Sequence, residues 1–173
     1  PVAQVAVAAG FGSVRRFNHL FKERYRLTPT QLRKRKPADG GQGITLHLAY
    51  RPPYGFAKLL VFFRARQLDG VEVVDGDSYT RAVRMEGAAA DGGDIVGWIR
   101  VTDEPAKGRL AVRMSETLLP VASQVAARVR RQFDTDCDPD AVHEGIRSLD
   151  GLVPGAAVPG TRVPGAFDPF EIA

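Results

Sequence analysis

Residues 44–50 read ITLHLAY, an alternation of apolar and polar side chains. Successive side chains of a strand point to opposite faces of a sheet, so this period of two predicts a strand with Ile44, Leu46 and Leu48 toward a core. The segment Arg51–Pro52–Pro53 ends the strand, because proline has no amide hydrogen to donate to a neighbouring strand. A sheet therefore begins here.

The chain after this strand alternates between helical spacing, short strands and turn clusters. Apolar residues at helical spacing predict a helix over 54–68. Ser115 is expected to cap a long helix to about Phe133, and Asp138 to cap a helix that begins at Pro139 and ends near Leu149. Four further strands are predicted between turn clusters, over 71–74, 77–85, 94–101 and 108–114. Antiparallel strands with helices on one face make an α+β domain.

Three helices are predicted at the beginning of the chain, over 2–33: two joined by a tight turn, and a third that Thr28 caps, with Pro29 at its first position. Gly10–Phe11–Gly12 supplies the turn, Ser13 is a favourable N-cap, and Phe17 and Phe21 fall on one helix face. The opposite face of this second helix is basic and carries Arg15, His19, Lys22 and Arg26. A short helix followed by a helix with a basic free face is what DNA recognition in the major groove requires.

Charge is distributed unevenly along the chain. Residues 1–36 hold nine Lys or Arg and one acidic residue, a net charge of +8, whereas 37–173 hold 15 basic and 19 acidic residues, a net charge of −4. A basic segment on an otherwise acidic chain indicates a polyanionic partner, and double-stranded DNA is the expected one. A membrane-surface helix is the competing interpretation, but the phenylalanine-rich face is needed for the helix-turn-helix core.

Composition limits the remaining classes. The single cysteine, Cys137, excludes an intramolecular disulfide and a cysteine-rich zinc site, and no apolar run is long enough for a membrane span, so a cytoplasmic location is expected. Residues 37–43 are rich in Pro and Gly and predict a linker. We therefore expect three parts: residues 1–36, an α+β domain over 44–134, and a connecting segment over 135–173. Because the sequence begins inside the predicted helix-turn-helix motif, we expect it to be a fragment of a longer protein.

The basic N-terminal segment resembles a known class of regulators. Its pattern is formed by Gly10, Phe11, Ser13, Phe17, Phe21, Lys22, Thr28, Pro29 and Arg33. This pattern resembles the second helix-turn-helix of AraC/XylS-type regulators, including the Ada type. The resemblance implies DNA binding through Ser13, Arg15, Arg16, His19, Lys22, Arg26 and Arg33. Arg15 and His19 are expected to reach base edges, and Arg16, Lys22 and Arg26 to reach phosphates. Family members carry two such units, so weak binding is expected from one.

The segment after the linker resembles the N-terminal domain of bacterial DNA-3-methyladenine glycosylase II. The matching pieces are YRPPY at 50–54, DSYTR at 77–81, LPVA at 119–122, FDTDCDP at 133–139, PGTRVPG at 159–165, and Phe167, Asp168 and Phe170. The resemblance implies a domain like one repeat of the TATA-binding protein, beside a helical catalytic domain. Some bacterial proteins fuse an Ada-type regulator to this glycosylase, in the order found here.

These resemblances imply a parent protein that hydrolyses the N-glycosidic bond of alkylated purines after base flipping. In the family, catalysis belongs to a later helix-hairpin-helix domain, so no catalytic residue, cofactor or metal ligand is assigned here and these residues alone are expected to be inactive. The alternative is an AraC-type transcription regulator whose α+β domain senses a ligand, for which an apolar pocket inside 44–134 would be needed. A pure interaction module is a third interpretation.

Other candidate chemistry is weaker. Asp134, Asp136 and Asp138 imitate a calcium loop, but its sixth position is Pro139 rather than glycine. Cys137 has no base beside it and is expected to be a buried structural thiol. Trp98 is expected to pack in the core or on a sheet face.

Overall fold

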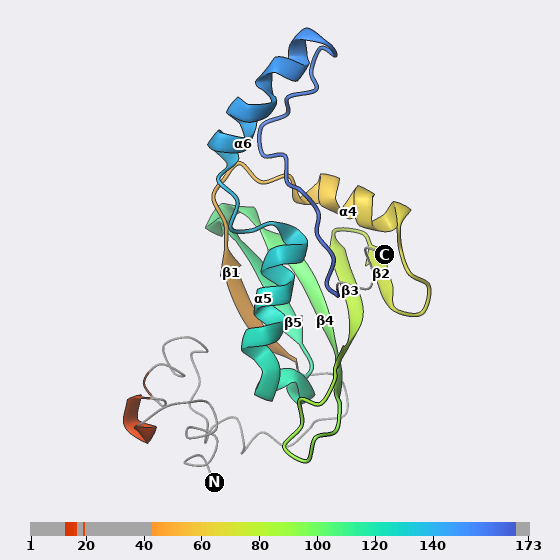
Figure 1. Cartoon of the computed structure of the whole chain (residues 1–173), viewed down its shortest axis with the longest axis vertical. Helices are drawn as coiled ribbons and strands as arrows, with labels where there is room; N and C mark the ends of the chain where they lie inside the picture. The colour runs from red at the N-terminus through yellow and green to blue at the C-terminus, as the bar shows by residue number, and fades with distance from the viewer. Residues whose placement is uncertain (1–12, 17–18, 20–42, 169–173) are drawn as a thin grey trace. The chain divides into compact units, whose positions relative to one another are not determined.

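The chain divides into two compact units, residues 1–42 and 43–173. In this computed structural model the described residues are 13–16, 19 and 43–168. The second unit forms the α+β domain that the sequence predicts (Figure 1).

Five antiparallel strands form one sheet in the order β1-β5-β4-β3-β2. The predicted strands are confirmed with ends that move by at most a few residues. The strands are β1 (Ile44–Ala49), β2 (Glu72–Asp75), β3 (Ser78–Met85), β4 (Ile95–Glu104) and β5 (Arg109–Met114). The first strand pairs with the last, so β1 closes the sheet at the edge opposite β2.

One face of this sheet is covered. The buried positions alternate along every strand and include Leu46, Leu110, Ile99 and Val83. Helix α5 (Ala122–Phe133) lies across β1, β5 and β4, and α4 (Phe56–Ala65) lies toward β2 and β3 (Figure 1). Helix α6 (Pro139–Ile146) extends away from the sheet and continues into the 3-10 turn η3 (Arg147–Gly151). Helices α4 and α5 therefore form a single layer on one face of the sheet.

The long helix predicted from Ser115 is interrupted. A 3-10 segment, η2 (Glu116–Val121), comes first, and the α-helix begins only at Ala122. Pro120 lies inside η2 and has no amide hydrogen for a helical bond, which accounts for the break. The Ser115 Oγ accepts the Trp98 amide hydrogen at 3.1 Å instead of capping the helix, so the predicted cap at Ser115 was wrong.

The cap predicted at Asp138 is confirmed. Its Oδ1 accepts the amide hydrogens of Asp140 at 3.1 Å and Ala141 at 3.4 Å, with Pro139 at the first helical position. Turns elsewhere use glycine where the backbone is left-handed, as at Gly108 (φ 58°) between η1 (Pro105–Lys107) and β5. Among the described residues, no helix has both the length and the apolar character to cross a membrane.

Gly97 offers a test of how η2 packs on the sheet. A Cβ built at Gly97 would lie 2.6 Å from Leu118 Cγ and 2.8 Å from Thr117 Oγ1. We expect Gly97→Ala to lower the free energy of unfolding by about 1–3 kcal/mol, because the contact is overpacked. The matched change Gly145→Ala, in α6 with open space around the glycine, should raise it by about 0.5–1 kcal/mol. Urea denaturation followed by circular dichroism measures both, and equal effects would contradict this packing.

Candidate nucleic-acid interface and its supporting clusters

The beginning of the predicted recognition helix is partly described. Residues 14–16 are helical, and the Arg16 amide donates to Ser13 Oγ at 3.4 Å, the bond expected of an N-cap. Arg15, Arg16 and His19 are exposed. Lys22, Arg26 and Arg33 lie outside the described residues, as does the rest of the predicted helix-turn-helix.

In the second unit, Arg162 joins two segments that are far apart in the sequence. Its Nη2 donates to the carbonyl oxygens of Arg51 at 2.7 Å and Pro53 at 3.1 Å. Its guanidinium carbon lies 4.9 Å from the centre of the Tyr54 ring, and its Nη1 is 3.7 Å from Cys137 Sγ. Arg162 is only 6% exposed, so a buried charge is solvated by backbone carbonyls rather than by water. We call this the Arg162 cluster.

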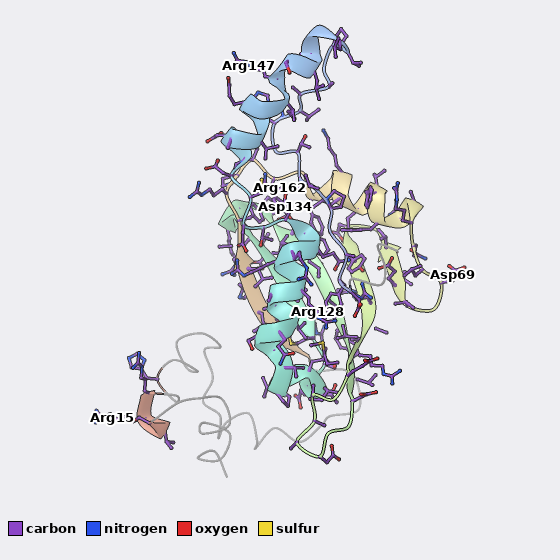
Figure 2. The ribbon with its side chains drawn as sticks, viewed as in Figure 1. Arg15, Asp69, Arg128, Asp134, Arg147 and Arg162 are labelled. Atoms are coloured by element: carbon purple, nitrogen blue, oxygen red, sulfur yellow. The ribbon has the colours of Figure 1, made fainter. Side chains whose placement is uncertain are left out.

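Neighbouring contacts connect the same segments of the chain to the end of α5. Figure 2 shows Arg162 and Asp134 close together, near the end of α5. Asp134 has a left-handed backbone (φ 50°) that ends α5, and its Oδ2 accepts the Val163 amide at 3.0 Å. The Tyr54 hydroxyl donates to the Phe133 carbonyl at 2.5 Å, and burial raises the pKa of Tyr54 above its ordinary value. The YRPPY, FDTDCDP and PGTRVPG pieces therefore meet at one place.

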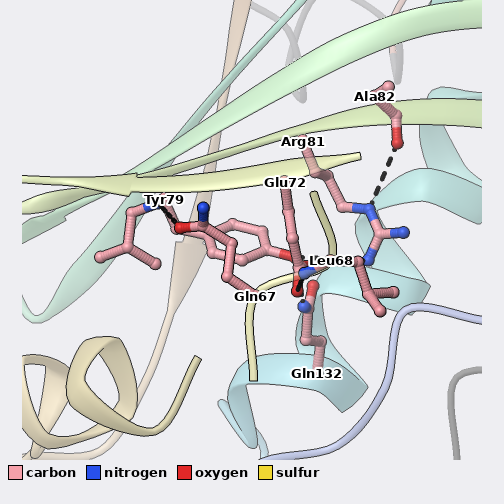
Figure 3. A network of polar contacts seen from close by, with 8 residues as sticks. Gln67, Leu68, Glu72, Tyr79, Arg81, Ala82 and Gln132 are labelled. Atoms are coloured by element: carbon pink, nitrogen blue, oxygen red, sulfur yellow. Dashed lines mark hydrogen bonds and ion pairs between the residues drawn. The ribbon is translucent and has the colours of Figure 1, made fainter. Parts of the chain in front are cut away.

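A second cluster is buried between the sheet and α5 (Figure 3). The Tyr79 hydroxyl donates to Glu72 Oε2 and accepts from Gln132 Nε2 at 2.8 Å and from Arg81 Nη1 at 3.3 Å. Arg81 Nη1 and Glu72 Oε2 are 3.7 Å apart, with both side chains less than a tenth exposed. Burial is the largest cause of the raised pKa of Tyr79, and the hydrogen bond to Glu72 raises this pKa further. Tyr79 therefore stays a neutral hydrogen-bonding group.

This Tyr79 cluster also holds the C-terminal segment. The Arg81 guanidinium carbon lies 4.4 Å from the centre of the Phe167 ring, and that of Arg128 lies 5.4 Å from it. Arg128 Nη1 is 3.2 Å from Asp168 Oδ2.

The sequence analysis did not predict the buried ion pair between Glu72 and Arg81. The signal was present in β3, where Arg81 occupies the same face as Tyr79 and Val83 and therefore had to be buried.

The three aspartates that imitate a calcium loop point to separate partners. Asp134 accepts from Val163, Asp136 is 2.7 Å from Arg130 Nη1, and Asp138 caps α6 and lies 2.6 Å from Arg51 Nη1. Cys137 is partly exposed rather than buried as expected. Burial, followed by the charge of Asp134, raises the pKa of its thiol, which disfavours the reactive thiolate.

Comparison with known families matches residues 45–168 to the AlkA N-terminal domain. The chain belongs to this family. DNA-3-methyladenine glycosylase 2 of Escherichia coli (strain K12) is 33% identical over 124 residues, which are 72% of this chain and 40% of that protein.

A second relative extends over the whole chain. It is a Mycobacterium tuberculosis protein named "Probable bifunctional transcriptional activator/DNA repair enzyme AlkA", 31% identical over 181 residues that cover 100% of this chain and 34% of the relative. The chain thus spans 34 to 40% of the length of these relatives.

In this AlkA N-terminal domain, the pieces that carried the resemblance act at joints between elements. Gly160 (φ 77°) approaches Pro53 so closely that a Cβ would lie 2.9 Å from the Pro53 carbonyl carbon. Gly165 likewise faces the Arg131 carbonyl, and its amide donates to the Gln132 carbonyl at 3.0 Å. These glycines allow the 159–165 loop to lie against the 52–54 turn and the end of α5.

Replacement of Arg162 should test the Arg162 cluster. We expect Arg162→Lys to lower the free energy of unfolding by about 2–4 kcal/mol, because one ammonium group cannot donate to two carbonyls and stack on Tyr54 at once. The control Arg147→Lys alters an exposed arginine and should change it by less than about 0.5 kcal/mol. Chemical denaturation of both variants makes the comparison. A loss of the same size in the control would count against a specific role for Arg162.

The Tyr79 cluster should make stability depend on pH in the alkaline range. Tyr79 has a raised pKa in the folded state, so its contribution is complete below about pH 10 and is lost as the pH rises further, by about 1.4 kcal/mol per pH unit. Tyr79→Phe should reduce this slope, and at neutral pH it should cost about 1–3 kcal/mol because Glu72 and Gln132 lose a partner. Denaturation at a series of pH values tests both effects, and an unchanged alkaline slope would contradict the assignment.

Proposed function

We propose that this chain is the DNA-binding and scaffolding part of a regulator–glycosylase that acts in base excision repair of alkylated DNA. The observation that carries the proposal is the likeness to the M. tuberculosis protein along the whole chain, which includes both compact units. That relative is named as a transcriptional activator and a DNA repair enzyme, and the E. coli relative as a DNA glycosylase.

In this proposal the first unit binds duplex DNA. Its net charge of +8 over residues 1–36 supports attraction to phosphates. The capped start of the helix and the exposed Arg15, Arg16 and His19 fit an element that enters a groove. Lys22, Arg26 and Arg33 complete the proposed contact set. The parent protein would hydrolyse the N-glycosidic bond of alkylated purines in a helix-hairpin-helix domain of the same chain, in the cytoplasm.

The second unit is proposed to be the scaffold over 44–134, with 135–173 leading toward the catalytic domain. A ligand-sensing role for this domain would require an apolar pocket behind the sheet. The covered face there is occupied by a run of aromatic rings in mutual contact, Tyr54, Phe56, Phe133, Phe63 and Tyr79, with centroids 5.1–6.5 Å apart. This filling favours a structural domain over a sensor.

A salt titration of duplex binding tests the DNA-binding role. Loss of one phosphate contact should lower the slope of log K against log salt by about one, so Lys22→Ala should weaken binding to all sequences alike. Arg15→Ala should cost roughly 1–3 kcal/mol, mainly on a preferred site. Arg147→Ala, in η3 of the second unit, is the control and should leave both quantities unchanged. Full affinity and full slope in both helix variants would refute the assignment of DNA binding to residues 1–36.

A further inference from the structure

The sheet has a second face on which the alternating positions, except the buried Ser78, are exposed or only partly buried. The strand residues Thr45, Thr80, Arg84, Trp98, Arg100 and Arg113 occupy this face. The covered face instead holds the apolar core together with the Tyr79 cluster. We call the second face the open face.

The centre of the open face brings two arginines together. Arg100 of β4 and Arg113 of β5 are direct register partners, and both are exposed. Like charges directly opposite one another on neighbouring strands lower the stability of a sheet. The register nevertheless places two exposed guanidinium groups side by side at the centre of the open face, an arrangement suited to a polyanionic partner.

Both arginines contact side chains of neighbouring strands on the open face. Arg100 Nε donates to Thr80 Oγ1 at 3.2 Å, and its terminal nitrogens have no hydrogen-bond partner within the part of the chain that the structure describes. The guanidinium carbon of Arg113 lies 5.9 Å from the centre of the Trp98 ring. A partly exposed indole beside two guanidinium groups offers both an apolar platform and charge.

Two acidic groups near the open face are paired with cations at its margins. Asp94 lies 2.6 Å from Arg84 Nη2, and the Gly87 amide and Arg84 lower the pKa of its carboxyl group. Glu104 contacts Arg109 Nε at 2.6 Å and Lys107 Nζ at 3.4 Å, so one carboxylate serves two cations. The three cations Arg84, Arg109 and Lys107 thus balance Asp94, Glu104 and the exposed Asp75 of β2, so the positive charge of the open face comes from Arg100 and Arg113 at its centre, even though residues 43–168 as a whole carry 15 basic and 17 acidic side chains.

We propose that the open face is a second DNA-binding surface, on which Arg100 and Arg113 contact backbone phosphates and Trp98 contacts an adjoining sugar or base. The inference rests on the proposed function, because a protein that acts on DNA has DNA as its expected polyanionic partner. Arginine is suited to this role since its planar fork donates two hydrogen bonds to one phosphate. A second copy of the chain is a poor occupant, because two positive faces would repel each other. An acidic protein surface is the remaining rival, and the test includes it.

The chain supplies its own probe for this surface, since Trp98 is its single tryptophan. We expect an undamaged duplex added to residues 1–173 to change the fluorescence of Trp98. The double variant Arg100→Thr/Arg113→Thr should abolish this change and lower the salt slope of log K by about two, one for each phosphate contact. Removing two like charges that face each other on neighbouring strands should not unfold the domain. A cooperative thermal melt of the variant verifies this.

The control removes two exposed charges elsewhere. Arg64 lies on α4 and Arg147 in η3, and Arg64→Thr/Arg147→Thr should leave the fluorescence change and the salt slope intact. An equal loss in this control, a wild-type signal that does not respond to DNA, or a signal that responds to poly-glutamate but not to DNA would overturn the inference.

Variants of the first unit separate this inference from the proposed function. If Arg15→Ala and Lys22→Ala weaken binding while Trp98 never responds to DNA, the first unit binds alone and the open face does not. If those variants have no effect while the open-face variant loses binding, the assignment to residues 1–36 fails and the open face stands.

Discussion

The buried guanidinium of Arg162 is the contact on which the arrangement of the second unit depends. A charged group at 6% exposure has lost most of its hydration, and the loss has to be offset by hydrogen bonds inside the protein. Arg162 obtains them from the carbonyls of the 51–53 turn, more than a hundred residues earlier in the chain. Because a carbonyl contributes only a partial charge, several must be brought close, and this fixes how the 159–165 loop lies on the domain.

This geometry explains why the part of the chain after α5 belongs to the same compact unit as the sheet. The Gly165 amide bonds to the Gln132 carbonyl, and Phe167 lies against Arg81 beside the Tyr79 cluster. The ends of 159–168 are thus held by two different buried arginines, one facing carbonyls and one facing a carboxylate. Arg162 binds the 159–165 loop to the 51–53 turn, and Arg81 of β3 binds the following segment to the covered face of the sheet through Phe167.

The sequence predicts the strands well because their signal is local. In β1 each apolar residue has a polar neighbour, and that alternation alone assigns the strand and its buried face. The interrupted helix was missed because Ser115 is a favourable N-cap by itself, whereas its hydroxyl is taken by the Trp98 amide, a partner 17 residues away. The buried Glu72–Arg81 pair was missed for a similar reason. Strand β2 has only four residues, and the charge of Glu72 suggests solvent until its partners in β3 and α5 are known.

The candidate DNA-binding residues show the same division between local and non-local information. The Ser13 cap is a local interaction that reaches only three residues along the chain. The Arg16 amide donates to Ser13 Oγ, as the predicted N-cap requires. The open face could not be read from the sequence, because Arg100 and Arg113 become neighbours only when β4 and β5 pair in the observed register. Net charge hid it as well, since residues 43–168 carry more acidic than basic side chains. Exposed charges are screened beyond about 8 Å at physiological ionic strength. The interaction of a DNA phosphate with the domain therefore depends on the charged groups within that distance and hardly on the net charge of the whole domain. An acidic domain can therefore present a surface that attracts DNA, provided that its carboxylates are held by cations at the margin, as Asp94 and Glu104 are here.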